Sequence, residues 1–135
     1  MPWVWHSAVH LYMTDINNKS NNNKRATGTK YEHVAGRFLE SKGFEIISYN
    51  YYGPHGEIDI IALDGDYIVF CEVKYRKKGH RYNSLRAVDK KKQQRIISCA
   101  RFYILKNKLK NVPCRFDVIG IEGNEIIHIK NAFSL

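Results

Sequence analysis

The amino-acid sequence predicts a single α/β domain in which a mixed β-sheet is flanked by helices. Three observations lead to this fold class. Segments typical of helices and strands follow one another in the order α-β-β-β-α-β-β. The second helix joins the third strand to the fourth, so that connection is a crossover. A chain of 135 residues, 44% of them hydrophobic, is long enough for one such core and too short for two ordinary domains.

An extension, residues 1–28, is predicted to precede the domain, which then covers residues 29–135. Residues 17–24 are polar, low in complexity and unable to bury apolar surface, so we expect disorder there. The first helix is expected to begin at Thr29, because Thr29 and Glu32 fit a capping box in which both side chains satisfy free amides of the first turn. The apolar residues of this helix recur at helical spacing: Tyr31, Val34, Ala35, Phe38 and Leu39.

Three strands are expected after the first helix, which ends at Gly43. They cover Phe44–Tyr51, Glu57–Leu63 and Tyr67–Lys74, which are rich in β-branched and aromatic residues. Asp64-Gly65-Asp66 separates the second and third of these segments and is a strong turn signal. The second and third strands therefore form a hairpin.

A longer helix is expected over Asp89–Leu105, followed by a second hairpin. The hairpin consists of Arg115–Ile121 and Glu125–Lys130, joined by a turn at residues 122–124. The apolar stripe of the helix has the spacing of one helix face. Its residues are Ile96, Ile97, Ala100, Tyr103 and Ile104.

The positive charge of the chain is concentrated in one segment. The whole chain carries +9, from 22 basic and 13 acidic residues. Residues 74–110 contain 14 Lys and Arg and one acidic residue, a local net charge of +13, and the rest of the chain carries −4. Such a distribution indicates one face that binds a polyanion, with nucleic acid as the first candidate. A basic but merely solvated helix and loop is the alternative.

Composition also bears on the cellular compartment. No apolar run approaches the roughly 20 residues that cross a bilayer, and the first residues lack the features of a secretory signal. The cysteines are odd in number and include no C-x-x-C pair, so neither zinc nor a redox dithiol is indicated. We therefore expect a cytoplasmic protein without a membrane partner.

Two acidic residues are expected to face each other across the first hairpin. Side chains alternate with a period of two along a strand, so Glu72 and Lys74 share one face of the third strand. If the turn is centred between Gly65 and Asp66, Asp59 lies opposite Glu72. A three-residue turn would shift this register by one position.

Opposed carboxylates of this kind need a compensating partner. They repel each other by up to roughly 1 kcal/mol, and their burial without partners costs several kcal/mol. Lys74 offsets this cost if it forms an ion pair, and a divalent cation would do so better, because Mg²⁺ prefers hard oxygen ligands. Charges that are simply solvated at the end of a hairpin are a third possibility. Spacing alone leaves these alternatives open.

Two motifs make up this hairpin, Gly56-Glu57-Ile58-Asp59-Ile60-Ile61-Ala62 and Val69-Phe70-Cys71-Glu72-Val73-Lys74-Tyr75-Arg76. Together they resemble the central signature of the YraN-like family of predicted endonucleases, and the resemblance covers residues 29–133. The family is similar to the PD-(D/E)XK nuclease superfamily, which includes archaeal-type Holliday junction resolvases. The resemblance therefore implies a restriction-endonuclease-like core. Further matching segments are Ala87-Val88, Lys92-Gln93, Cys114–Val118 and Ile129–Phe133.

The same resemblance assigns roles to residues of the site. Asp59, Glu72 and the backbone carbonyl of Val73 would bind Mg²⁺ (or Mn²⁺). Lys74 would orient the attacking water or stabilise charge on the phosphoryl group. Glu32 would be an accessory acid at the active site, although the capping-box interpretation explains it equally well.

Gln93 and several basic residues complete the predicted site. Gln93 places an amide in the apolar stripe of the second helix, where a polar side chain normally has a hydrogen-bonding task. Related nucleases often use a residue of this helix near the active site. Lys92 flanks the stripe and is expected to contact phosphate. The loop after the hairpin is expected to grip phosphates as well, through Arg76, Lys77, Lys78, Arg81 and Arg86.

The sequence thus leads to one main functional hypothesis and two alternatives. The main hypothesis is an Mg²⁺-dependent endonuclease that acts on DNA, in branched or structured form, and that works as a homodimer if it cuts junctions. A nucleic-acid-binding module that keeps the fold without cutting is the first alternative. A structural protein whose hairpin charges neutralise one another is the second.

Overall fold

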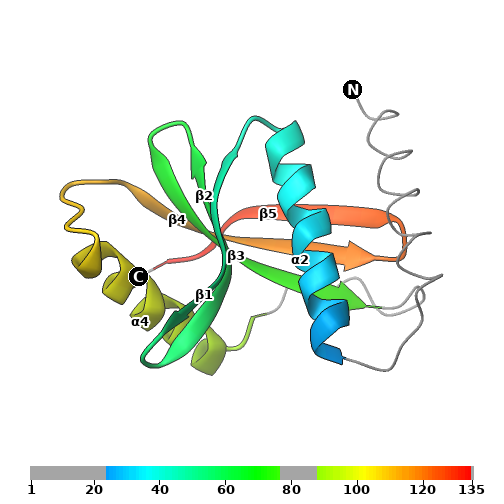
Figure 1. The fold of residues 1–135 in the computed structure, drawn as a ribbon, viewed down its shortest axis with the longest axis horizontal. Coiled ribbons are helices and arrows are strands. Elements are labelled where there is room, and N and C mark those ends of the chain that lie inside the picture. Colours follow the sequence, from blue (N-terminus) through cyan, green and yellow to red (C-terminus); the bar gives the residue numbers. More distant parts are fainter. Residues whose placement is uncertain (1–23, 77–87, 135) are drawn as a thin grey trace.

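The computed structural model describes residues 24–76 and 88–134, and these form an α/β fold with a five-stranded mixed sheet (Figure 1). The strand order is β1-β2-β3-β4-β5. β3 and β4 are parallel and the other neighbours are antiparallel, with α4 as the crossover, as the sequence predicts. The elements are α2 (Lys24–Ser41), β1 (Glu45–Gly53), β2 (Gly56–Asp64), β3 (Tyr67–Arg76), α4 (Lys90–Lys106), β4 (Cys114–Glu122) and β5 (Glu125–Phe133).

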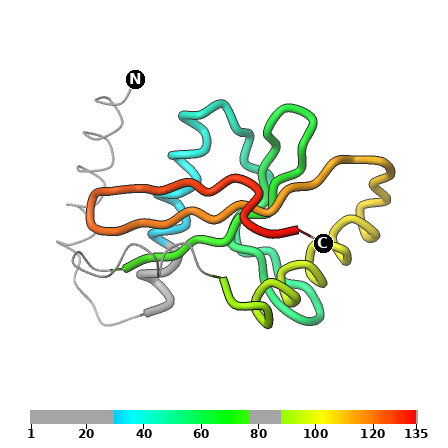
Figure 2. Tube along the Cα trace, turned by 180° about the vertical axis from the view of Figure 1, so that it is seen from behind, coloured from blue at the N-terminus to red at the C-terminus, as the bar shows by residue number. Residues whose placement is uncertain are grey.

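The β2–β3 hairpin occupies the interior of the sheet. β1 forms one edge, and β5 forms the other as the long hairpin partner of β4 (Figure 2). Within the described residues, no helix is long and apolar enough to cross a membrane. Both faces of the central hairpin pack against helices, α2 on one side and α4 on the other. Charged side chains buried there need partners.

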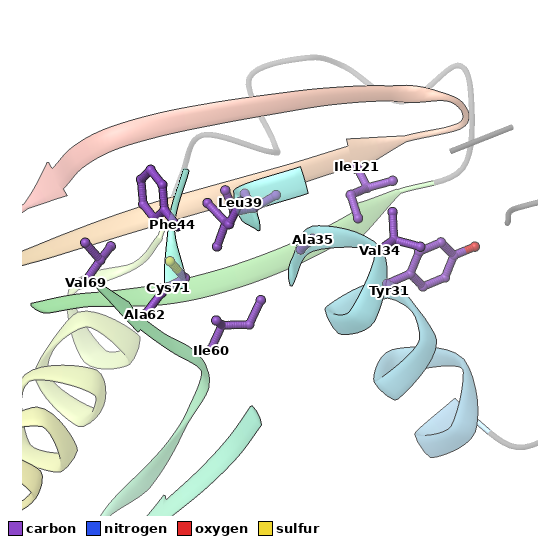
Figure 3. Packing of buried hydrophobic residues seen from close by; sticks show 11 residues of the cluster. Tyr31, Val34, Ala35, Leu39, Phe44, Ile60, Ala62, Val69, Cys71 and Ile121 are labelled. Carbon is purple, nitrogen blue, oxygen red and sulfur yellow. The ribbon is translucent and has the colours of Figure 1, made fainter. Parts of the chain in front are cut away.

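Among the described residues, α2 packs on one face of the sheet and α4 on the other. Side chains alternate along the strands, so neighbouring residues of one strand contribute to different faces. Val69 and Cys71 of β3 belong to a core cluster with α2, whereas Ile68 and Phe70 belong to a second cluster with α4. In the first cluster, Val34, Ala35 and Leu39 of α2 lie against β2 and β3 (Figure 3). The second cluster contains Ile96, Cys99 and Ala100 of α4, which agrees with the predicted stripe and adds Cys99 to it.

The start of α2 differs from the prediction. The helix begins at Lys24, so Thr29 lies inside it and the capping-box interpretation of Thr29 and Glu32 is wrong. Amides near Thr29 find carbonyl partners in the preceding helical turn and need no side-chain cap. The expected extension is otherwise outside the described residues, which begin at residue 24.

The other helix ends follow the sequence signals closely. Gly43 has a φ of 91°, and the N–H groups of Gly43 and Phe44 donate to the carbonyls of Glu40 and Leu39, which is a Schellman ending. α4 begins after Asp89, whose side chain accepts a hydrogen bond from a backbone amide of the first turn.

The register of the first hairpin is also as predicted. Gly65 and Asp66 form the turn, Gly65 with a φ of 59°, and the ladder runs from the pair Asp64–Tyr67. A shift by one residue, as a three-residue turn would have produced, is not observed. On β3, Ile68 and Phe70 therefore share one face, as the sequence predicts, and Val69 and Cys71 share the other.

Candidate active site

Asp59 and Glu72 lie where β2 and β3 separate. The ladder between the two strands ends at the pair Ile60–Cys71, so Asp59 and Glu72 are the next residue on each strand. Oδ2 of Asp59 accepts a hydrogen bond of 2.8 Å from the N–H of Val73. The side chain of Asp59 thus accepts a hydrogen bond from the backbone of β3 just beyond the end of the backbone ladder between β2 and β3.

The strand β2 changes face at Asp59. Ile58 packs in the cluster of α4 and Ile60 in the cluster of α2, although residues two apart on a regular strand share a face. The strand is therefore rotated around Asp59. As a result, the carboxyl group interacts both with Glu72 on β3 and with Glu32 on α2.

Glu32 reaches the hairpin from α2. Its side chain forms hydrogen bonds with Asn50 and Asp59, and its Oε2 is buried with no hydrogen-bond partner among the described residues. Burial raises the pKa of Glu32, and the negative charges of Glu57 and Glu72 raise it further. The hydrogen bonds with Asn50 and Asp59 lower it only in part. The structure therefore places Glu32 at the site.

Three acidic side chains consequently share one small region. Burial raises the pKa of Asp59 to about 9, with the negative charges of Glu72 and Glu32 acting in the same direction and the hydrogen bond from Val73 opposing them. Asp59 and Glu72 are only 8% and 7% exposed. Without further positive charge, the cluster holds a proton at neutral pH. The region is therefore suited to a cation.

Lys92 forms an ion pair with Glu72, with 3.1 Å between Nζ and Oε1. Lys92 lies in the first turn of α4, and its backbone N–H donates to Oδ1 of Asp89 at 2.7 Å. The sequence places Lys92 beside the apolar stripe but does not reveal this partner. A signal existed in the Asp89 cap, because it sets which residues of the first turn face the sheet.

An open pocket lies beside Glu72. It is lined by Glu72, Lys74, Arg76, Asp89 and Lys92, among others. Burial lowers the pKa of Lys74, and the positive charges of Arg76 and Lys92 act in the same direction. A buried carboxylate with basic side chains around it presents both charges that a metal-bound phosphate group requires.

The residues suit a magnesium ion that keeps several water ligands better than a metal ion whose ligands are all protein side chains. Among residues 24–76 and 88–134, no group of three or more His, Cys, Asp or Glu side chains is arranged to hold a metal ion. Mg²⁺ typically uses one or two carboxylates and keeps several waters, which Asp59 and Glu72 satisfy. The unpartnered Oε2 of Glu32 is a buried acceptor of the kind that a metal-bound water would satisfy.

Some predicted residues have other contacts or lie outside the described residues. Nε2 of Gln93 donates a hydrogen bond of 2.8 Å to the carbonyl of Val88, which ties the first turns of α4 to the residue before its N-cap. Arg76 is exposed at the pocket, and its Nη1 donates to the carbonyl of Tyr75. The remaining basic loop residues, Lys77, Lys78, Arg81 and Arg86, lie outside the described residues.

A second polar cluster, on β4 and β5, was not predicted. Asp117 is fully buried and accepts hydrogen bonds from the guanidinium of Arg115 at 2.8 and 3.0 Å and from the N–H of Asn131 at 3.0 Å. Nε2 of His128 lies 2.7 Å from its Oδ2. Burial raises the pKa of Asp117, but these hydrogen bonds outweigh it and the net pKa is lowered. The cluster ties β5 to β4.

Comparison with known proteins identifies the group to which the chain belongs. A model of the uncharacterised protein family UPF0102 matches residues 31–121. The chain belongs to the UPF0102 family. UPF0102 is the YraN-like group, so the family expected from the hairpin residues is confirmed. All acidic and basic residues of the site described above, from Glu32 to Lys92, fall within the matched region.

Several UPF0102 relatives cover most of the chain. A protein of Lachnoclostridium phytofermentans is 42% identical over 112 residues, which are 82% of this chain and 95% of that protein. One from a Sulfurihydrogenibium species is 41% identical over 112 residues, 83% of this chain and 97% of the relative. One from Klebsiella pneumoniae is 38% identical over 118 residues, with shares of 86% and 92%. The chain thus corresponds to nearly the full length of these relatives.

Proposed function

We propose that this UPF0102 protein is a metal-dependent endonuclease that hydrolyses phosphodiester bonds of DNA. One observation carries the proposal: the carboxyl groups of Asp59 and Glu72 are buried side by side on separating strands, next to a pocket lined by basic side chains. Burying acidic groups is costly, and a site that only bound a polyanion would need basic residues alone. Catalysis with a divalent cation gives these acidic groups a task.

The side chains of the site have distinct roles under this proposal. Asp59 and Glu72, with the backbone carbonyl of Val73, would hold Mg²⁺ or Mn²⁺. Such a cation supplies Lewis-acid polarisation of a phosphoryl oxygen and lowers the pKa of a bound water. Lys74 stabilises negative charge on the phosphoryl group from the pocket wall. Glu32 accepts a hydrogen bond from water through its unpartnered Oε2.

The substrate class and the setting are part of the proposal. The resemblance to Holliday junction resolvases favours branched or structured DNA, and symmetric cutting of a junction requires two active sites, hence a homodimer. The net charge of +13 in residues 74–110 supplies contacts to the phosphate backbone. A cytoplasmic location agrees with free thiols at Cys71 and Cys99.

The proposal is tested by cleavage of labelled duplex, single-stranded and four-way-junction DNA in Mg²⁺ or Mn²⁺. Asp59→Asn and Glu72→Gln are expected to abolish cleavage while DNA binding persists. Asp66→Asn, an exposed acid at the turn of the same hairpin, serves as the matched control and should cut at the wild-type rate. Equal cleavage by wild type and Glu72→Gln would refute the site. Binding without cleavage of any of these DNAs would instead favour a non-cleaving nucleic-acid-binding module.

A further inference from the structure

The Lys92–Glu72 ion pair joins two groups that the proposed reaction needs for other purposes. Glu72 is a proposed ligand of the cation, and its carboxylate is engaged by an ammonium group at 3.1 Å. Lys92 lines the pocket proposed for phosphate, and its charge is engaged by Glu72. Each member of the pair thus reduces the other's availability for its own ligand.

The geometry allows Lys92 to change partner without a change in the fold. Its side chain is 45% exposed, whereas that of Glu72 is 8% exposed. The backbone of Lys92 is held by its hydrogen bond to the Asp89 cap, so rotation of the long flexible side chain suffices to move the ammonium group. Lys74 and Arg76 line the same pocket and leave the ammonium in an environment suited to phosphate.

The charge balance gives the exchange a direction. The carboxyl groups of Glu32, Asp59 and Glu72 interact in this region, and Glu57 adds a further negative charge near Glu32. On the positive side, Lys92 is ion-paired with Glu72, and the ammonium group of Lys74 also interacts with Glu72. A divalent cation shared by Asp59 and Glu72 supplies more positive charge than Lys92 and repels it at short range. The ammonium is then free for a phosphate oxygen, which the same cation also attracts.

We propose that Lys92 occupies Glu72 when no divalent cation is bound and moves to a DNA phosphate when one binds. The inference rests on the proposed function of the site and adds to it a coupling between two ligands. Because the release of Lys92 serves both, the cation strengthens DNA binding and DNA strengthens cation binding by the same factor. Lys92 acts here as a binding and positioning residue, and the coupling is measurable without cleavage.

The first test measures Mn²⁺ binding by electron paramagnetic resonance of the free ion, without DNA. Lys92→Met removes the competing ammonium, so its Mn²⁺ affinity is expected to exceed that of wild type severalfold. Lys91→Met is the matched control, because Lys91 is the exposed neighbouring residue with the same charge. The control should bind Mn²⁺ with wild-type affinity. An affinity of Lys92→Met equal to that of wild type would overturn the inference.

The second test measures binding of a fluorescent duplex, in EDTA and in Ca²⁺, by anisotropy over a range of salt concentrations, with the DNA checked for intactness. In EDTA, Lys92 is engaged by Glu72, so Lys92→Met and wild type should show the same salt dependence. In Ca²⁺, wild type gains one phosphate contact, so its slope of log affinity against log salt should be steeper by about 0.9 than that of Lys92→Met. A permanent phosphate contact would give the same difference in both buffers and would overturn the exchange.

The outcomes separate this inference from the proposed function. Wild-type Mn²⁺ binding that Asp59→Asn abolishes supports the cation site whatever Lys92 does. No Mn²⁺ binding by wild type or by Lys92→Met would refute both proposals. If Lys92→Met does not fold, Lys92→Gln replaces it, because the amide keeps a hydrogen bond to Glu72 without the charge. Lys92→Gln should then show the higher Mn²⁺ affinity, and wild-type affinity would again overturn the exchange.

Discussion

Asp59→Asn is expected to stabilise the metal-free protein at neutral pH. The unfolded chain releases the proton of Asp59 near the ordinary pKa of 3.8, whereas burial and the neighbouring carboxylates keep it on the folded protein up to about 9. Above pH 4 the folded state therefore binds more protons than the unfolded state, and the free energy of unfolding falls as the pH rises. Asparagine keeps an acceptor for the N–H of Val73 and does not ionise.

The magnitude follows from the pH interval between the two titrations. At pH 7 the unfolded chain has passed its pKa by about three units, at about 1.4 kcal/mol per unit, so the penalty reaches at most about 4 kcal/mol. Because Asp59 interacts with two further carboxyl groups, those of Glu72 and Glu32, substitution of Asp59 recovers about 2 to 4 kcal/mol of this penalty. The gain should shrink toward zero near pH 4.

Urea unfolding in EDTA at pH 4, 5.5, 7 and 8.5, followed by circular dichroism, measures this effect. Asp66→Asn is again the control, since the exposed Asp66 should change the free energy of unfolding by less than about 0.5 kcal/mol. Addition of Mg²⁺ should stabilise wild type more than Asp59→Asn, because the substitution removes a proposed ligand. A variant that is less stable than wild type at pH 7 in EDTA, or a gain that does not depend on pH, would refute the reasoning.

Two further predictions concern stability away from the site. Asp117→Asn should lower the free energy of unfolding at pH 7 by about 3 kcal/mol, because it breaks the buried pairs with Arg115 and His128. The pKa of Asp117 is lowered in the folded protein, so this loss of stability, measured by chemical denaturation, should diminish at acid pH. An equal loss at all pH values would contradict this account. Gly36→Ala should cost about 1 to 3 kcal/mol, because a Cβ at Gly36 would overlap the hydroxyl of Tyr49. Thermal unfolding should show partial recovery when Tyr49→Phe is added, and no recovery would place the strain elsewhere.

The elements and the hairpin register were predictable because local chemistry determines them. The Asp64–Asp66 turn and the alternation of apolar residues specify the register from a few neighbouring positions. Gly43 ends α2 for an equally local reason, since it adopts a backbone conformation that other residues adopt at a cost. The Thr29 capping box was a local pattern as well, but the helix continued upstream to Lys24 and made it unnecessary.

The composition of the site was only partly predictable. Asp59, Glu72 and Lys74 belong to one hairpin, so their proximity follows from its register. Glu32 joins them only because α2 packs on one face of the sheet and β2 is rotated at Asp59, which brings the carboxyl group of Asp59 near Glu32. Gln93 looked like a site residue from its position in the stripe, whereas its observed partner is the carbonyl of Val88.

The sequence by itself determined the order of the elements, the register of the central hairpin and the two acidic residues that face each other at its end. The tertiary structure alone decided which charges meet those residues: Lys92 on Glu72, and Glu32 beside Asp59. The physical reason is the range of the interactions. Turns and strand periodicity act between near neighbours, whereas an ion pair between α4 and β3 depends on how two elements pack across the sheet, which no local pattern specifies.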